Sequence, residues 1–145
     1  MTIPSGPAGE PEVRKQLMPR IEALWGDLAA LALSTRHRFS ALQKSQVPET
    51  PGAYTIYEEE TQYILYVGQT DNLRFRIMEN HLCKRGESTF VKSVQQHRGF
   101  ATRSEACDHI RKQCSVAWLE IGDARKLMLL EHFAIAVMQP SLNRG

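Results

Sequence analysis

The sequence has few cysteines and no hydrophobic run long enough to cross a membrane. Its three cysteines, Cys83, Cys107 and Cys114, are odd in number and have no CxxC spacing, so we expect no disulfide framework and a reducing compartment. No apolar run approaches the ~20 residues that a membrane span requires. Residues 1–11 lack the basic-then-apolar pattern of a signal peptide. These absences predict a cytoplasmic location and no membrane partner.

The chain also lacks a strong net charge. Its 18 Lys and Arg against 16 Asp and Glu leave +2, a balance that permits nucleic-acid binding without indicating it. Basic residues nevertheless gather in the middle third, whereas residues 58–60 are three consecutive glutamates. That separation predicts a basic face toward phosphates, with a mixed, solvated surface as the alternative. P-loop, GxGxxG and HExxH patterns are absent, so none of those three sites is predicted.

The length of 145 residues, with 42% hydrophobic and 23% charged residues, predicts one compact domain with some extra chain. Residues 1–11 are rich in Pro, Gly and Ala, which is typical of a disordered leader. Residues 12–45 have apolar positions at helical spacing, so 12–49 is interpreted as a helical extension and linker, and 50–145 as the main domain. We expect the helix to pack on the main domain; a homodimer contact or a protein partner is the alternative.

Within the main domain, polar turns separate runs of strand and helix type. The patterns predict a hairpin over 52–68, helices over 73–83, 88–96 and 104–112, a strand over 114–121 and a final helix over 124–138. The order β-β-α-α-β-α is typical of an α+β fold. We therefore predict a small three-stranded, mainly antiparallel sheet flanked by helices.

Two short motifs lie fourteen residues apart in the predicted hairpin: Gly52-Ala53-Tyr54 and Tyr66-Val67-Gly68. Arg76 follows the second motif by eight residues. Further on come Glu131 in the last predicted helix and a Pro140-x-x-Asn143 element. Each feature alone is weak. Together, in this order, they resemble the GIY-YIG nuclease superfamily over residues 50–145.

The resemblance implies a metal-dependent endonuclease, and it assigns a role to each motif residue. Tyr54 would be the general base and Tyr66 would orient the attacking water. Arg76 would stabilise the phosphoryl charge, since a guanidinium suits phosphate geometry. Glu131 would hold one divalent ion, Mg²⁺ or Mn²⁺. Asn143 would tie the C-terminal tail to the site.

His81 departs from the family pattern. Many members carry a histidine four residues after the arginine, but here that position is Asn80, and His81 stands at spacing five. Five residues of α-helix rotate a side chain by about 500°, well past one turn. We therefore treat His81 as an optional acid or base, with a surface histidine as the alternative.

Four further residues are candidates for substrate binding: Gly68, Arg74, Lys84 and Arg85. The expected partner is nucleic acid, with DNA preferred. A non-catalytic nucleic-acid-binding module and a partner-dependent adaptor are the alternative functions. A zinc site built from His81, Cys83, Cys107 and His109 is a weaker alternative, because its pairs are too closely spaced for a structural zinc site.

Overall fold

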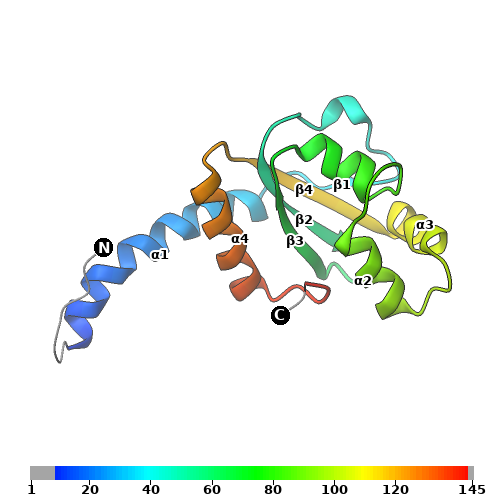
Figure 1. The fold of residues 1–145 in the computed structure, drawn as a ribbon. Helices are drawn as coiled ribbons and strands as arrows, with labels where there is room; N and C mark the ends of the chain where they lie inside the picture. Colours follow the sequence, from blue (N-terminus) through cyan, green and yellow to red (C-terminus); the bar gives the residue numbers. More distant parts are fainter. Residues whose placement is uncertain (1–8, 144–145) are drawn as a thin grey trace.

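The computed structural model describes residues 9–143. Most of the expected leader, residues 1–8, lies outside the described residues. The described residues form α-helices, a 3₁₀ segment, a π segment and four strands (Figure 1). In chain order the elements are α1 (Glu10–Ala32), β1 (His37–Arg38), η1 (Lys44–Gln46), β2 (Gly52–Glu58), β3 (Ile64–Thr70), η2 (Phe75–Asn80), α2 (Thr89–Arg98), α3 (Arg103–Gln113), β4 (Cys114–Glu120) and α4 (Ala124–Met138).

The four strands form one antiparallel sheet in the order β1-β4-β2-β3. Strand β2 is central and buried along its whole length. It places Tyr54 opposite Gly68 on β3 and Trp118 on β4. The α+β class with an antiparallel sheet is confirmed. The two-residue strand β1 was not expected, because a strand this short leaves no alternating pattern in the sequence.

The two faces of the sheet bury different sets of side chains. On one face, α1 and α4 cover an aliphatic cluster that includes Leu31, Val67 and Leu130. On the other, α2, α3 and η2 cover a larger cluster that includes Tyr54 and Phe90. Figure 1 shows α4 and the end of α1 on the opposite side of the sheet from α2. The period-two alternation of a strand sends successive residues to opposite faces, which is why Ala53 and Tyr54 belong to different clusters.

The N-terminal helix is shorter than expected. Helix α1 ends at Ala32, so the prediction of a helix over 12–45 is wrong for residues 33–45. Phe39 and Leu42, two apolar residues of this stretch, are buried in the cluster with Tyr54. Each reaches that cluster from a loop beside β1. The apolar spacing correctly indicated that these residues are buried. It did not indicate a helix, because tertiary packing and not helical periodicity sets their positions.

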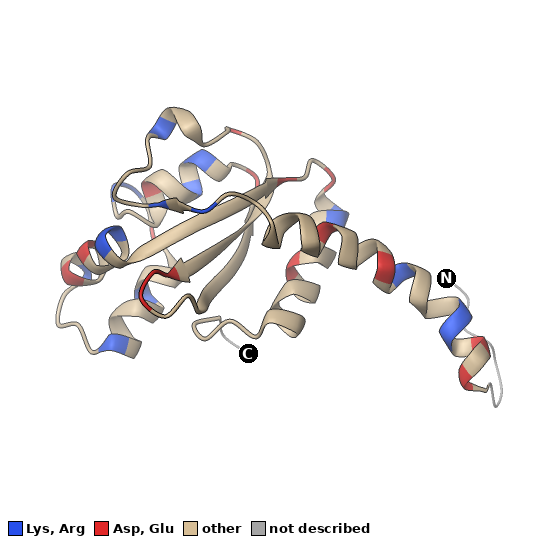
Figure 2. Ribbon diagram, turned by 180° about the vertical axis from the view of Figure 1, so that it is seen from behind, with Lys and Arg blue, Asp and Glu red and all other residues tan. Residues whose placement is uncertain are grey.

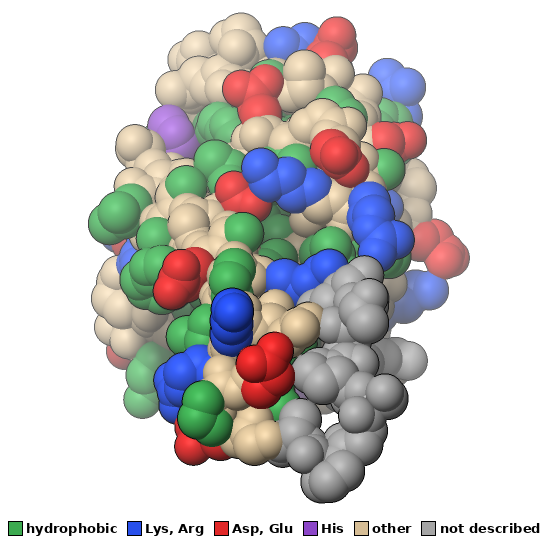
Figure 3. Space-filling model, turned by 90° about the vertical axis from the view of Figure 1, so that its left-hand side faces the viewer, with side chains coloured by type: hydrophobic (Ala, Val, Ile, Leu, Met, Phe, Trp, Pro, Cys, Tyr) green, Lys and Arg blue, Asp and Glu red, His purple; other side chains and the backbone are tan. Residues whose placement is uncertain are grey.

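Only the C-terminal part of α1 packs on the domain. Leu28 and Leu31 are buried, and Asp27 forms an ion pair with Lys126 of α4 at 3.5 Å. The N-terminal part extends away from the sheet (Figure 1). Trp25, two residues before Asp27, is 60% exposed. Seen from that side, hydrophobic side chains are scattered among charged ones (Figure 3). Among the described residues, no helix has the length and apolar character needed to cross a membrane.

Candidate active site

The segment between β3 and α2 winds as a π-helix over Phe75–Asn80. Asn72 opens it by accepting the backbone N–H of Phe75 on its side-chain oxygen at 3.0 Å. The N–H of His81 then donates to the carbonyl of Arg76 at 3.0 Å, an i→i+5 bond. The expected α-helix over 73–83 is therefore wrong in type. Because a π turn spans five residues, His81 lies one turn beyond Arg76 despite its spacing.

The extra residue brings His81 against Tyr54. Its Nε2 lies 2.7 Å from the Tyr54 hydroxyl, and its Nδ1 lies 2.6 Å from Ser88 Oγ. His81 is 1% exposed and Tyr54 2%. The rings of Tyr66 and Phe90 pack around the imidazole, with centroids 6.2 and 5.5 Å away. The alternative of a surface histidine is thus excluded.

Burial sets the protonation of this pair. It lowers the pKa of His81 to about 3, and the nearby Arg76 charge adds to the effect. Burial also raises the pKa of Tyr54 well above its usual value, and nearby Tyr66 adds to this. His81 is therefore neutral and Tyr54 a protonated phenol near pH 7. These states disfavour Tyr54 as the general base and His81 as a general acid, because desolvation penalises each charged form.

Tyr66 is less enclosed than Tyr54. Its ring centroid lies 6.2 Å from that of Tyr54, and the residue is only partly buried on β3. Burial raises the pKa of Tyr66, with a further increase from Glu131 and an opposing effect of Arg76. The charges of Arg76 and Glu131 also influence the pKa of Tyr54, with Arg76 lowering it and Glu131 raising it.

Gly68 is required by Tyr54. It lies directly across from Tyr54 in the sheet register, and a Cβ at this position would overlap the Tyr54 ring and hydroxyl. The residue lies inside β3, which continues to Thr70, two residues beyond the end of the hairpin expected over 52–68. Its missing side chain makes room for the buried phenol, which is a reason for the glycine that needs no contact with substrate.

Glu131 projects from α4 beside β3. It is half-buried, and its Oε1 accepts a hydrogen bond from Gln69 Nε2 at 3.2 Å. Among the described residues, the Glu131 carboxylate forms no ion pair with Arg76, Arg125 or Lys126. A half-buried carboxylate that keeps one oxygen outside this hydrogen bond fits the donor set of Mg²⁺, which takes one or two carboxylates and otherwise water and phosphate oxygens.

Asn143 holds the C-terminal tail against the edge of the sheet. Its side chain accepts the N–H of Val67 and donates to the carbonyl of the same residue, both at 2.8 Å. The tail continues this pairing through the N–H of Leu142, which donates to the Leu65 carbonyl at 2.8 Å. Since β3 is an edge strand, these bonds satisfy backbone groups that would otherwise lack partners. Asn143 thus supports the strand that carries Tyr66.

The cationic side chains predicted to bind substrate differ in how far they are already bound by protein groups. Arg74 donates to the Val47 carbonyl at 2.7 Å and pairs with Glu49 at 3.1 Å, so its guanidinium is engaged in holding the preceding loop. Arg85 lies 3.8 Å from Glu79. Lys84 is exposed at the surface. The Arg74 guanidinium is therefore partly engaged by protein groups, whereas Lys84 and Arg85 are exposed; a role of the three in substrate binding stays a prediction.

The expected separation of charge is weak. Basic residues of the middle third are mostly paired with carboxylates, as in Arg98–Glu58, Arg111–Asp108 and Lys92–Glu87. Figure 2 shows acidic and basic positions interspersed along α1 and α3. The alternative of a mixed surface describes the molecule better than a single basic face does.

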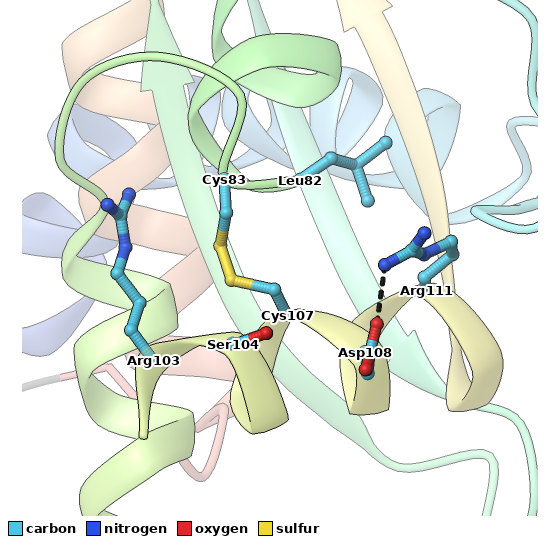
Figure 4. Close-up of a pocket in the computed structure, with 7 residues that line it drawn as sticks. All are labelled: Leu82, Cys83, Arg103, Ser104, Cys107, Asp108 and Arg111. Carbon is cyan, nitrogen blue, oxygen red and sulfur yellow. Dashed lines mark hydrogen bonds and ion pairs between the residues drawn. A yellow bond between two sulfur atoms is a disulfide. The ribbon is translucent and has the colours of Figure 1, made fainter.

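Cys83 and Cys107 form a disulfide, so our expectation of unpaired cysteines is wrong for this pair. The bond joins the segment after His81 to α3 across a shallow depression lined also by Arg103 and Arg111 (Figure 4). Sequence spacing could not reveal it, because the cysteines are 24 residues apart and approach only when α3 packs beside that segment. Cys114 remains a buried free thiol. With both cysteines of the zinc alternative joined, that site loses half of its ligands.

Ser88 and Gln69 belong to the site although the sequence did not single them out. Ser88 lies at the start of α2, where its hydroxyl accepts the N–H of Val91 at 3.1 Å. A serine before an apolar run is a helix-start signal, and that signal was visible. Its second contact, with His81, depends on tertiary structure. Gln69 follows Gly68 directly and carries no pattern of its own.

Together these features define an α+β domain with a buried Tyr–His–Ser chain, one arginine and one carboxylate at the edge of a sheet. No protein-family model matches the chain. It is 26% identical over 132 residues to the excinuclease Cho of Salmonella typhimurium, an alignment that covers 91% of this chain and 36% of that protein. The chain therefore spans about a third of the length of this curated relative.

Solved structures of the GIY-YIG N-terminal endonuclease domain of UvrC from Thermotoga maritima are also similar. The magnesium-bound form has 17% identity and a TM-score of 0.45, covering 70% of this chain and 91% of that one. A point mutant of the same domain, bound to its catalytic divalent cation, gives 16% and 0.45 over the same shares. The name of that domain contains the same GIY-YIG motif whose resemblance we noted in the sequence.

Proposed function

We propose that this chain is a divalent-metal-dependent endonuclease domain that hydrolyses phosphodiester bonds, with DNA as the preferred substrate. One observation carries the proposal: the rings of Tyr54, Tyr66 and His81 lie with centroids within 6.2 Å of one another, and the π turn that places His81 there also carries Arg76. Phosphodiester hydrolysis needs a cation for the phosphoryl oxygens, a ligand for a metal ion and a group that positions water. The similarity to an excinuclease supports the same reaction class.

The geometry favours a division of roles that differs from the one first expected. Tyr54 is held on His81 and kept protonated by burial, so it suits hydrogen-bond donation. Tyr66 is only partly buried, so we place it nearest the attacking water. Arg76 would bind the phosphoryl oxygens, and Asn143 would keep the strand of Tyr66 in place.

Glu131 is the residue that would hold a divalent ion. Mg²⁺, or Mn²⁺ in its place, would act as a Lewis acid on the phosphoryl group when bound. Gln69 orients the carboxylate by donating to one oxygen, which leaves the other available as a ligand. Phosphate oxygens and water would complete the octahedral shell that Mg²⁺ prefers.

The test is cleavage of labelled single-stranded, duplex and branched DNA, and of RNA, with Mg²⁺ or Mn²⁺. Wild type is compared with Glu131→Ala and with the control Glu60→Ala, which changes an exposed carboxylate on the hairpin turn. We expect wild type and the control to cut, and Glu131→Ala to be inactive but folded. Full activity in Glu131→Ala would remove the metal assignment. Binding without cutting by wild type would favour a non-catalytic module.

A further inference from the structure

Tyr54, His81 and Ser88 form a continuous hydrogen-bonded chain inside the domain. The Ser88 hydroxyl lies 2.6 Å from His81 Nδ1, and the Tyr54 hydroxyl lies 2.7 Å from Nε2. Ser88 is 2% exposed and His81 1%. Both ring nitrogens thus bond to hydroxyls that can either donate or accept. The direction of the chain depends on which nitrogen carries the imidazole proton.

A neutral imidazole can accept only one of the two hydroxyl protons. If Ser88 donates to Nδ1, then Nε2–H donates to Tyr54, and the Tyr54 proton is directed elsewhere. If Tyr54 donates to Nε2, then Nδ1–H donates to Ser88, and the Ser88 proton needs another acceptor. A buried hydroxyl proton without an acceptor loses the hydrogen bond that it would make in water, which destabilises the arrangement. The arrangement that leaves its spare proton near acceptors is therefore the stable one.

The surroundings of Ser88 favour the first arrangement. Ser88 is the N-cap of α2, and its oxygen already accepts the N–H of Val91 at 3.1 Å. A helix N-terminus presents N–H groups, which are donors and cannot take a hydroxyl proton. Among the described residues, His81 Nδ1 is the only acceptor in hydrogen-bond contact with Ser88 Oγ. The Ser88 proton therefore goes to His81.

The other end of the chain faces the proposed site. The Tyr54 ring lies 6.2 Å from that of Tyr66 between centroids, and its hydroxyl lies against Gly68, which places no side chain over it. A Tyr54 proton that is not donated to His81 can be given to water or to a phosphate oxygen on this side. Only at this end can the spare proton be used.

We propose that Ser88 is a positioning residue that holds His81 as the Nε2–H tautomer, so that His81 donates to Tyr54 and Tyr54 turns its own O–H toward the scissile phosphodiester. The functional half of this statement rests on the proposed nuclease activity. The tautomer does not, because it is a property of the free protein. Ser88 acts on the reaction only through His81 and Tyr54.

Two substitutions separate capping from proton donation. Ser88→Thr keeps a hydroxyl, whereas Ser88→Asp keeps a good N-cap oxygen but cannot donate as a carboxylate. Long-range ¹H–¹⁵N NMR of the His81 ring, at about pH 8.5 and so above the ordinary histidine pKa of about 6.5, reads the tautomer. Thermal unfolding checks that both variants fold, and turnover is measured at the same pH.

We expect the Nε2–H tautomer in wild type and Ser88→Thr, and a proton on Nδ1 in Ser88→Asp. Turnover should stay within about threefold in Ser88→Thr and fall roughly a hundredfold in Ser88→Asp, the usual effect of losing one aligned donor. An Nδ1–H tautomer in wild type would overturn the proposal, as would an unchanged tautomer in Ser88→Asp. If wild type has the Nε2–H tautomer but cuts no substrate, the tautomer assignment holds and the proposed function fails.

Discussion

The two faces of the sheet bury different kinds of side chain, aliphatic on one face and partly polar on the other. The face under α1 and α4 is closed by aliphatic side chains such as Leu31, Val67 and Leu130. The face under η2 and α2 buries a phenol, an imidazole and a serine hydroxyl in direct contact. Hydrocarbon burial stabilises without direction, whereas buried polar groups demand fixed partners. One face therefore gives the domain stability, and the other gives it a preorganised site.

The largest expected effect is on the polar face. Replacing Arg76 with Ala should lower turnover roughly 10²–10³-fold, since a preorganised cation aimed at developing charge is typically worth that much. Affinity for nucleic acid should fall far less, as measured by fluorescence anisotropy. The matched control is Arg74→Ala, whose guanidinium is held by Val47 and Glu49. Equal losses of turnover and affinity in Arg76→Ala would make Arg76 a binding residue.

A truncation on the aliphatic face should affect folding and spare the chemistry. Leu130→Ala truncates a side chain of α4 that is fully buried against the sheet, and we expect a loss of about 3 kcal/mol in the free energy of unfolding. Its neighbour Leu129 is 39% exposed, so Leu129→Ala should cost less than about 0.5 kcal/mol. Urea unfolding measures both. Equal costs at the two positions would contradict this division between buried and exposed faces.

Reducing the Cys83–Cys107 bond should loosen the polar face alone. The bond joins the segment between His81 and Ser88 to α3, and closing a loop of this size is worth about 3 kcal/mol. We expect a lower melting temperature with dithiothreitol than without it. The double variant Cys83→Ser with Cys107→Ser should melt alike in both conditions. If dithiothreitol leaves the melting temperature of the wild type unchanged, the disulfide adds no stability.

The smallest effect concerns acid pH. In the folded protein burial holds the pKa of His81 at about 3, whereas in the unfolded chain it should be near 6.5. Below 6.5 only the unfolded state takes up this proton, so stability should fall as pH falls, by about 2 kcal/mol at pH 5. Above 6.5 this group adds no pH dependence.

This loss of stability at acid pH is measured by the free energy of unfolding from pH 8 down to about pH 5. His81→Gln should reduce the loss of stability between about pH 8 and pH 5. His132 is exposed and provides the control, since His132→Gln should leave that loss unchanged. An equal loss of stability at acid pH in His81→Gln would mean that other groups cause it.

The sequence by itself determined most of the elements. Strand β4, α2, α3 and α4 lie within two residues of their expected bounds, because capping residues and alternating apolar runs are local signals. The motif order also identified Tyr54, Tyr66, Arg76 and Glu131 as one constellation. Their catalytic roles remain predictions for the experiments above.

Tertiary structure decided how those residues work. The spacing of His81 looked out of register until the chain wound it through a π turn, and no local pattern announces such a turn. The His81–Tyr54 bond, the Cys83–Cys107 disulfide and the burial of Tyr54 all arise from contacts between segments far apart in sequence. Burial then set the protonation of Tyr54 and His81, because the cost of a charge depends on the surrounding medium and not on neighbours along the chain.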